Sequence, residues 1–370
     1  MDDSLVLDRA DSAERSAWLR LALTPGLGAR AARELLAAFG LPGAIVDSST
    51  SALAHVVGEQ AARALTAEPP EFVTTAITAT EAWLAGDARR SLLTLADADY
   101  PQSLLDSPDP PLVLFALGRR ELLTRPALAI VGARNCTQQG VANAEAFAEF
   151  LGHAGLTIVS GLAAGIDAAA HRGGLRTAAS TIAVMGTGMD RLYPARNRAL
   201  GEAIRDQGLL LSELPLGTPP VAANFPRRNR LIAGLSRGTL VVEAALHSGS
   251  LITAQLALEA GREVFAVPGS IHSPLAKGCH RLIKNGARLV EAASDVLDEL
   301  RMPKGTTPVA RSSGTPHASL MDTMGFDPIA LDTLAACSGM TIETLSAALL
   351  DLEMTQDVER LPGNRYQRLR

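Results

Sequence analysis

The feature that most constrains the fold is a regular alternation of short apolar runs with segments of helical length. The apolar runs are residues 128–131, 156–159, 182–185, 209–211, 240–242 and 264–267. Segments long enough for helices, such as residues 143–151 and 251–260, separate them. Continuously apolar strands that alternate with helices are typical of a parallel sheet covered on both faces. The pattern predicts an α/β fold with a Rossmann-like doubly wound parallel sheet over residues 91–300.

The composition is that of a soluble globular protein. The chain has 370 residues, of which 47% are hydrophobic and 20% charged, and a net charge of -5; this allows two or three domains. No run of about eighteen apolar residues lacks a charge, so no membrane partner is expected. The first residues, Met-Asp-Asp-Ser, are acidic, unlike a signal peptide. Cys136, Cys279 and Cys337 are too far apart for a metal site or a disulfide framework, which indicates a cytoplasmic protein.

Residues 1–90 are predicted to form a helical N-terminal domain. Its segment Leu23-Thr-Pro-Gly-Leu-Gly-Ala-Arg resembles the turn of a helix-hairpin-helix or SAM-like element. Gly26 and Gly28 permit a tight turn, and the helix that follows begins with free N–H groups. Such an element contacts nucleic-acid phosphates in many proteins. A purely structural turn in a helical bundle has the same pattern and is the simpler interpretation.

The C-terminal region divides into a linker and a small domain. Residues 301–325 are rich in Gly, Pro, Ser and Thr, which predicts the linker. Residues 329–337 and 342–353 have the periodicity of amphipathic helices, and Pro362-Gly363-Asn364 marks a turn between two short strands. This order predicts a winged-helix-like domain over residues 326–370. Such domains bind duplex DNA or proteins, and the sequence leaves both open.

A cationic island on this acidic chain is the strongest indication of function. Arg227, Arg228, Arg230 and Arg237 fall within eleven residues that contain no carboxylate. The island follows Phe225 and lies between two predicted strands, where open α/β sheets bind ligands. Arginines suit an extended anion such as phosphate, and a phenylalanine ring offers a flat face for a base. A solvated, basic helix start would have the same composition.

The loops after the predicted strands are rich in small residues. In the first, Gly132 permits a sharp turn, Arg134 can reach a phosphate and Thr137 can cap the next helix. The loop lacks the G-x-G-x-x-G pattern, so no dinucleotide cofactor is expected. The third loop contributes Gly186, Gly188, Arg191 and the ring of Tyr193. After the fifth strand, the hydroxyl and N–H groups of residues 248–250 could hold an anion.

The second loop runs from Ser160 and carries two titratable residues. Asp167 and His171 are four residues apart and share a helix face. They could form an acid–base pair, or they could fix the loop through hydrogen bonds, which is the interpretation we favour. The chain has no Walker motif, no metal-binding cluster and no G-x-S-x-G elbow. We therefore expect a site that holds phosphates, with no catalytic residue, metal or cofactor.

Six motifs occur in an order that resembles one known family. They are Gly132-Ala-Arg, Ser160-Gly-Leu-Ala-Ala-Gly-Ile-Asp, Gly186-Thr-Gly with Tyr193-Pro, Phe225-Pro-x-Arg-Asn-Arg-x-Ile-x-Gly-Leu-Ser, Val242-Glu-Ala with Ser248-Gly-Ser-Leu-Ile-Thr-Ala, and Val267-Pro-Gly. Together they resemble the DprA (Smf) family of DNA-processing proteins, strongly over about residues 95–300. One position departs from the family pattern, because His280 stands where the family commonly has Asn.

The resemblance implies a cytoplasmic homodimer without enzymatic activity. Such a protein binds incoming single-stranded DNA during natural transformation, protects it and helps to load the recombinase RecA. The residues that the resemblance and the loops together assign to DNA binding are Gly132, Arg134, Asn135, Gly161, Gly186, Gly188, Arg191, Phe225, Arg227, Arg228, Asn229, Arg230, Ser248, Gly249 and Ser250.

Two other functions remain as hypotheses. The segment from Gly238-Thr to Glu243 is similar to part of the LOG family of nucleotide phosphoribohydrolases. Those enzymes carry Pro-Gly-Gly before the Gly-Thr, whereas Leu235-Ser-Arg stands there in this chain. The third hypothesis is a regulator that binds duplex DNA through the C-terminal domain.

Overall fold

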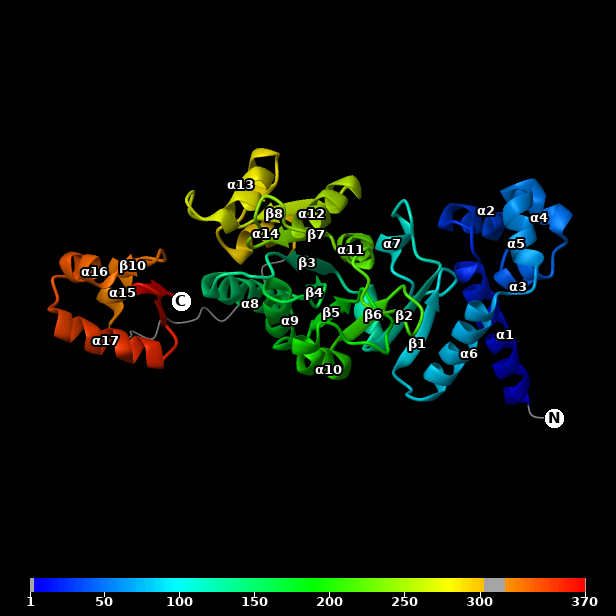
Figure 1. The fold of residues 1–370 in the computed structure, drawn as a ribbon, viewed down its shortest axis with the longest axis horizontal. Helices are drawn as coiled ribbons and strands as arrows, with labels where there is room; N and C mark the ends of the chain where they lie inside the picture. The colour runs from blue at the N-terminus through cyan, green and yellow to red at the C-terminus, as the bar shows by residue number, and fades with distance from the viewer. Residues whose placement is uncertain (1–2, 303–316, 370) are drawn as a thin grey trace.

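Three parts follow one another along the molecule: a helical N-terminal part, a central sheet covered by helices and a small C-terminal part (Figure 1). The structure is a computed structural model and describes residues 3–302 and 317–369. The first part consists of α1 (Asp3–Leu23), α2 (Ala29–Phe39), α3 (Pro42–Val46), α4 (Thr50–Val57), α5 (Glu59–Thr66) and α6 (Glu71–Ala85). Leu35, Leu53 and Leu65 are buried in its core. Gly26, with a φ of +78°, lies in the predicted turn between α1 and α2.

The central sheet has nine strands in the order β1-β2-β6-β5-β4-β3-β7-β8-β9. The strands are β1 (Arg90–Thr94), β2 (Val113–Gly118), β3 (Ala127–Val131), β4 (Thr157–Ser160), β5 (Thr181–Val184), β6 (Leu209–Ser212), β7 (Gly238–Val241), β8 (Glu263–Ala266) and β9 (Arg288–Leu289). All six predicted strands are present, and they pair in parallel from β6 to β8. The Rossmann-like α/β fold is confirmed.

The sheet continues beyond the six predicted strands and is antiparallel at one edge. β2 pairs antiparallel with β6, and β1 pairs antiparallel with β2. The segment between β1 and β2 contains four prolines, at positions 101, 108, 110 and 111. The apolar run of β2 follows them and covers the edge of β6 that would otherwise be exposed.

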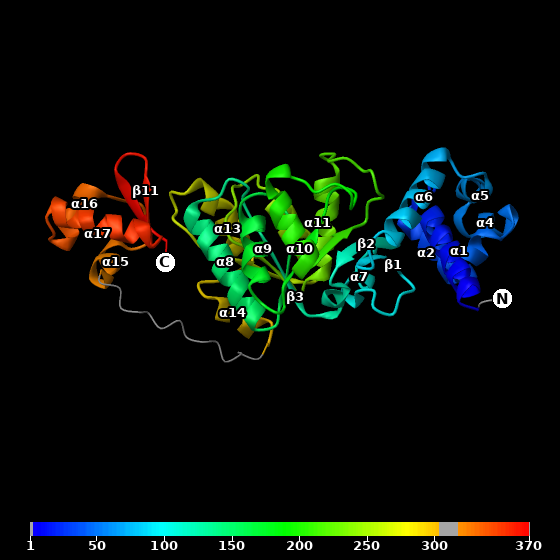
Figure 2. The ribbon, with the colours of Figure 1, turned by 90° about the horizontal axis from the view of Figure 1, so that it is seen from below.

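Helices cover both faces of the parallel strands. Leu128 and Ile130 point toward α8 (Gln138–His153) and α9 (Ile166–Leu175). Ala129 and Val131 point to the other face, where residues of α11 (Asn224–Leu235) and α12 (Ser250–Glu259) pack. This alternation follows from the two-residue period of a strand. Figure 2 shows α8, α9 and α10 (Arg198–Gln207) side by side along the sheet.

The strand order creates a switch point between β3 and β7. From β3 the chain builds the sheet outward through β4, β5 and β6, and it then returns to place β7 on the other side of β3. The loops after β3 and β7 therefore diverge from the same edge of the sheet. In open α/β sheets, ligands bind in the crevice outside the carboxyl ends of the strands at such a point.

The C-terminal part is a winged helix, as predicted. It contains α15 (Ala318–Met324), β10 (Ile329–Ala330), α16 (Leu331–Ser338), α17 (Ile342–Met354), β11 (Val358–Leu361) and β12 (Arg365–Arg368), with the strands in the order β10-β12-β11. The helix predicted to begin at residue 329 begins at residue 331, because residues 329 and 330 pair with β12.

The predicted linker, residues 301–325, is too long at its C-terminal end. Residues 303–316 lie outside the described residues. Leu320, Met321 and Met324 of α15 are buried in the core of the winged helix, so this helix belongs to the domain and not to the linker.

In residues 3–302 and 317–369, no single helix is long and apolar enough to cross a membrane; only α16 and α17 taken together reach that length and apolarity, and they are bent by 108°. No group of three His, Cys, Asp or Glu side chains in these ranges could hold a metal ion.

Candidate functional site

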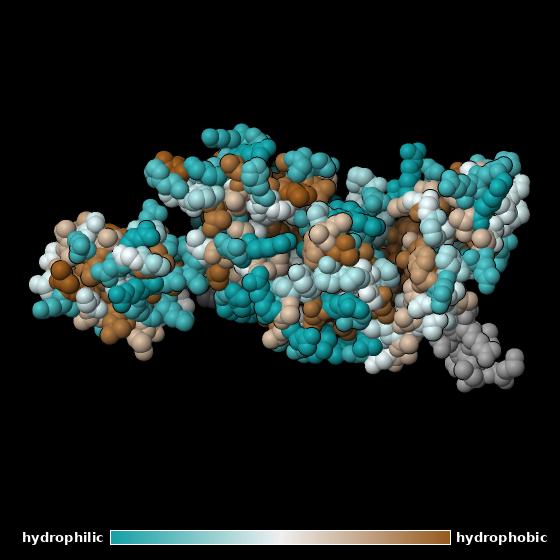
Figure 3. All heavy atoms as spheres, viewed as in Figure 1, coloured by the Kyte–Doolittle hydropathy of each residue, from teal (hydrophilic) through white to brown (hydrophobic). Residues whose placement is uncertain are grey.

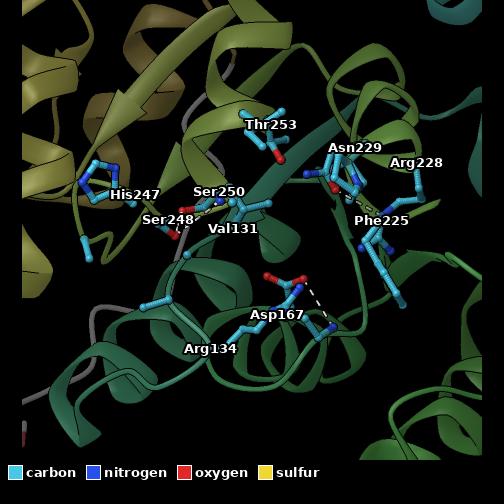
Figure 4. A pocket seen from close by; sticks show the side chains of 18 of the residues that line it. Val131, Arg134, Asp167, Phe225, Arg228, Asn229, His247, Ser248, Ser250 and Thr253 are labelled. Atoms are coloured by element: carbon cyan, nitrogen blue, oxygen red, sulfur yellow. Dashed lines mark hydrogen bonds between the residues drawn. The ribbon is translucent and has the colours of Figure 1, made fainter. Parts of the chain in front are cut away.

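An open pocket of about 800 Å³ lies at the switch point between β3 and β7. Three segments form most of it: the loop after β3, the loop between β7 and α12, and the first half of α11. Figure 4 shows side chains of α11 on one side of the pocket and those of residues 247–253 on the other, with Arg134 and Asp167 between them. Nine of the predicted residues line it, namely Gly132, Arg134, Asn135, Phe225, Arg228, Asn229, Ser248, Gly249 and Ser250.

The loop after β3 is held tightly against the end of β7. A Cβ atom on Gly132 would lie 2.6 Å from Cγ1 of Ile166 and 2.9 Å from the carbonyl oxygen of Glu243, so only glycine fits there. Thr137 caps α8 as predicted, since its hydroxyl oxygen accepts a hydrogen bond of 2.9 Å from the N–H of Gly140. The same hydroxyl donates a hydrogen bond of 2.6 Å to the Glu243 carboxylate. The loop is thereby ordered without the help of a ligand.

Arg134 is the available cation of this loop. Its side chain is exposed at the pocket, and no described residue offers it a hydrogen bond or an ion pair. Asn135 is exposed beside it. Buried Asp167 attracts the Arg134 guanidinium only through space, so the guanidinium N–H groups stay available for charge-assisted, bidentate hydrogen bonds with a phosphate.

The second loop confirms the structural interpretation of Asp167 and His171. The Asp167 carboxylate accepts hydrogen bonds from the N–H groups of Gly161, at 3.1 Å, and Ala163, at 3.4 Å. Nε2 of His171 accepts one of 3.2 Å from the N–H of Leu162. Burial lowers the pKa of His171 to about 3, so the ring is neutral at physiological pH. His171 therefore fixes the loop and does not exchange protons with a ligand.

Arg228 supports the pocket from below. Its side chain is almost completely buried, and its Nη1 donates hydrogen bonds to the carbonyl oxygens of Gly161, at 2.8 Å, and Val184. The expectation that Arg228 is free to grip a phosphate is corrected, because its guanidinium already joins the ends of β4 and β5. Burial lowers the pKa of Arg228 to about 10, with Asp167 opposing the shift, so the group stays charged and adds positive potential beneath the pocket.

Arg227 and Arg230 turn away from the pocket toward Glu213. Nε of Arg227 lies 3.3 Å from Oε1 of Glu213, and Arg230 forms an ion pair with the other carboxylate oxygen. Arg230 also donates a hydrogen bond of 2.6 Å to the carbonyl oxygen of Asp109. Glu213 is the acidic partner that the predicted cationic island lacked in the sequence. Arg227 and Arg230 therefore both have acidic partners, since Asp109 also lies 3.8 Å from Arg230, which corrects the expectation of several free cations.

The remaining predicted residues lie behind the pocket or beside it. Gly161 lies under Arg228, where a Cβ atom would overlap the guanidinium. Gly186 supports Phe225, because a Cβ atom there would lie 2.7 Å from the ring. Gly188 and Arg191 belong to the loop after β5 and do not line the pocket.

Two aromatic rings form one wall of the pocket. The centroids of Tyr193 and Phe225 are 5.6 Å apart, with an angle of 42° between the ring planes. Phe225 is half-buried, whereas Tyr193 is 47% exposed. The third loop contains Tyr193, but this residue is missing from the predicted site residues. Only the fold brings residues 193 and 225 together, so the sequence alone could not place the ring at the site.

The opposite wall is the loop that leads into α12. The hydroxyl oxygens of Ser248 and Ser250 lie 2.7 Å apart, and the N–H groups of Ser250 and Leu251 already donate to the hydroxyl and the carbonyl oxygen of Ser248, so the hydroxyl groups are what this turn offers a ligand. His247 is exposed next to them, and Leu246 and Ile252 add exposed aliphatic side chains to the lining. His247 and Ile252 belong to the motifs recognised after the fifth strand but were not among the predicted site residues, and no motif pointed to Leu246.

Residues 91–301 match the family described as DNA recombination-mediator protein A, and residues 304–364 match the DprA winged helix domain. Protein Smf of Escherichia coli (strain K12) is 42% identical over 287 residues, which cover 74% of this chain and 76% of that protein. The DNA processing protein DprA of Streptococcus pneumoniae (strain ATCC BAA-255 / R6) is 48% identical over 206 residues, 56% of this chain and 73% of that protein.

Solved structures agree with this assignment. The X-ray structure of DprA from Streptococcus pneumoniae has a TM-score of 0.64 and 37% identity, and the match covers 78% of this chain and 97% of that chain. DNA processing protein A from Helicobacter pylori, whose structure is described in terms of its single-stranded DNA binding mode, has a TM-score of 0.52 and 29% identity, over 57% of this chain and 96% of that one. The chain belongs to the DNA recombination-mediator protein A family.

Proposed function

We propose that this chain binds single-stranded DNA in the pocket between β3 and β7, without chemical turnover. One observation carries the proposal: exposed Arg134, for which the described residues offer no ion-pair partner, shares a pocket with the rings of Tyr193 and Phe225. A cation for phosphates beside rings for bases suits a strand whose bases are unpaired. The Helicobacter pylori relative is described as binding single-stranded DNA, which supports this class of ligand.

The geometry favours a single strand over a duplex. In a duplex the faces of the bases are stacked on one another, so the two rings could engage a base only after it has been unstacked, which costs a few kcal/mol. Phosphate contacts carry no base information, and stacking accepts any base. Binding should therefore depend on strand length and salt concentration more than on base sequence.

Within residues 3–302 and 317–369, no feature favours the phosphoribohydrolase hypothesis. Gly238 and Thr239 lie inside β7 rather than in a loop at the pocket. The carboxylate of Glu243 accepts hydrogen bonds from the hydroxyl and the N–H of Thr137, at 2.6 and 2.9 Å. Glu243 thus has a structural role and does not line the pocket.

Family membership supports a wider role as a recombination mediator. We infer that the chain works in the cytoplasm as a homodimer, protects incoming single strands during natural transformation and helps RecA to load on them. RecA-dependent ATP hydrolysis on oligothymidine that is precoated with single-strand-binding protein tests the loading step. The proposal expects the full chain to shorten the lag before hydrolysis, and an unchanged lag at saturating chain would reject the loading role.

Fluorescence anisotropy tests the binding itself. Labelled oligothymidine and a duplex of equal length are titrated with the full chain at one salt concentration. We expect the single strand to bind at least about tenfold more tightly. Equal or tighter binding of the duplex would reject the proposal. Release of a base from nucleoside monophosphates under the same conditions would favour the hydrolase instead.

A further inference from the structure

The winged helix has an unusual third helix. In a helix-turn-helix protein the second helix of the motif enters the major groove of DNA, and α17 occupies that position here, after α15 and α16. α17 contains no lysine or arginine, but it carries Glu343, Asp351 and Glu353. Duplex binding depends on neutralising phosphates with cations. The charge of α17 therefore opposes the role that its position suggests.

The outer face of α17 is also apolar. Ile342, Leu350 and Met354 are 55%, 58% and 79% exposed, and with Ser346 they form one ridge, four residues apart along the helix. The inner face is occupied by Leu345, Leu349 and Leu352, which are buried in the core of the domain. α17 thus has apolar side chains on both faces, although packing within the domain uses only one. Figure 3 shows hydrophobic side chains at the surface of the C-terminal part.

The cations of the domain lie elsewhere. Residues 317–369 contain eight carboxylates and three arginines. All three arginines, Arg360, Arg365 and Arg368, belong to β11 and β12. Arg368 lies over the ring of Phe326, at 4.8 Å from its centroid, and donates a hydrogen bond of 2.8 Å to the carbonyl oxygen of Met321. α17 itself therefore contributes carboxylates and apolar side chains but no cation.

We propose that the outer face of α17 is a docking surface for a cationic, amphipathic protein helix, and that duplex DNA is not its ligand. The ridge of Ile342, Leu350 and Met354 would pack against the apolar face of the partner helix, as when an amphipathic helix lies in a hydrophobic groove. Glu343 and Asp351, on the neighbouring ridge, would face its lysines or arginines. Complementary charge of this kind selects the partner and speeds its association. This inference is independent of the single-strand site at the switch point.

Two labelled peptides serve as probes for the full chain. Both are amphipathic helices of about five turns with the same leucine face; one carries lysines on its polar face and the other carries glutamates. We expect the lysine peptide to bind at least about tenfold more tightly than the glutamate peptide. The double variant Leu350→Glu with Met354→Glu should weaken binding of the lysine peptide at least about tenfold. Phe72→Glu, at an equally exposed ring on α6, is the matched control and should have no effect.

Reversing the charge of Glu343 and Asp351 tests the contribution of the carboxylates separately from that of the apolar ridge. Glu343→Lys with Asp351→Lys should invert the preference, so that the glutamate peptide binds better. Asp351 lies 3.6 Å from Nε2 of His317, so thermal melts must first show that the domain of the double variant stays folded. Glu343→Lys alone leaves the contact between Asp351 and His317 in place, and it should at least weaken binding of the lysine peptide. Equal binding of the two peptides to the native chain would overturn the proposal, as would variants of α17 that bind both peptides unchanged. Loss of duplex binding in the Leu350→Glu and Met354→Glu variant would overturn it too, because α17 would then contact DNA.

Discussion

The guanidinium of Arg228 donates a hydrogen bond of 2.8 Å to the carbonyl oxygen of Gly161, at the floor of the pocket. A second bond reaches Val184, and the charge also stabilises the buried carboxylate of Asp167. The most informative arginine in the sequence is therefore part of the fold itself. Its charge reaches a ligand through the floor of the site and not through a free side chain.

Replacing Arg228 should destabilise the protein before it affects binding. Arg228→Ala leaves two buried carbonyl groups and a buried carboxylate without their partner, which should lower the free energy of unfolding by roughly 3 kcal/mol. Urea denaturation measures this loss. Arg227→Ala is the control, since its side chain is 62% exposed, and it should change stability by less than about 0.5 kcal/mol. Equal stability of the two variants would contradict the structural role of Arg228.

The ring of Tyr193 should raise single-strand affinity by stacking on a base and not through charge. Tyr193→Ala removes a stacking surface, which should weaken binding of oligothymidine by about 1–3 kcal/mol. The slope of log K against log salt should stay the same, because no phosphate contact is lost. Phe72→Ala removes an exposed ring from α6 and should leave affinity unchanged. An altered salt slope with intact affinity would be inconsistent with stacking by Tyr193.

Local sequence patterns predicted most of the architecture of this chain. Six apolar runs separated by helices specified the parallel strands, because buried parallel strands are continuously apolar. The same logic missed β1 and β2, which lie on either side of a proline-rich segment and pair antiparallel at the edge. The helix Ala318–Met324 was assigned to the linker because its neighbours are rich in Gly, Pro and Ser, although its methionines and leucine pack in the core.

The site was predicted less completely, because charge alone does not show which partner a side chain finds. Glu213 pairs with both Arg227 and Arg230 from a different strand end, so no local pattern could reveal it. The approach of Tyr193 to Phe225 likewise depends on the packing of two distant loops. Arg134 was predicted correctly to lie at the pocket, since its place directly after a buried strand determines its position.

Buried His171 should make stability depend on pH. Its pKa is about 3 in the folded protein and 6.5 ordinarily, so the unfolded chain binds a proton that the folded chain excludes. The free energy of unfolding should therefore fall as the pH drops below about 6.5, by up to about 1.4 kcal/mol per unit until about pH 3.

The variant His171→Gln isolates this contribution. The pKa of buried Asp167 is raised, and this contributes to stability with the opposite sign, because the folded protein takes up that proton first. Both proteins retain Asp167, so the difference between their pH profiles reports His171. Parallel profiles between pH 5 and 7 would show that His171 is not buried as a neutral ring.

Removing the winged helix should leave the single-strand site intact. A chain that ends at Met302 keeps Leu300 in the core, where its carbonyl oxygen accepts a hydrogen bond of 2.9 Å from Arg237. The removed domain is acidic, so its loss should change oligothymidine affinity by less than about threefold. At low salt, any change should be toward tighter binding. Circular dichroism checks that the shortened chain is folded. A folded chain without single-strand affinity would place the main DNA site in the C-terminal domain.

The most direct measurement of the central claim is the salt dependence of oligothymidine binding by Arg134→Ala. Arg134 is exposed at the pocket, so its removal should leave stability unchanged. Affinity should fall by roughly tenfold, and the slope of log K against log salt should become shallower by about 0.7, the value for one lost phosphate contact on a single strand. Arg63→Ala, at an exposed arginine of α5, should behave like the native chain. If Arg134→Ala binds with native affinity and native slope, the pocket at the β3–β7 switch point is not the DNA site.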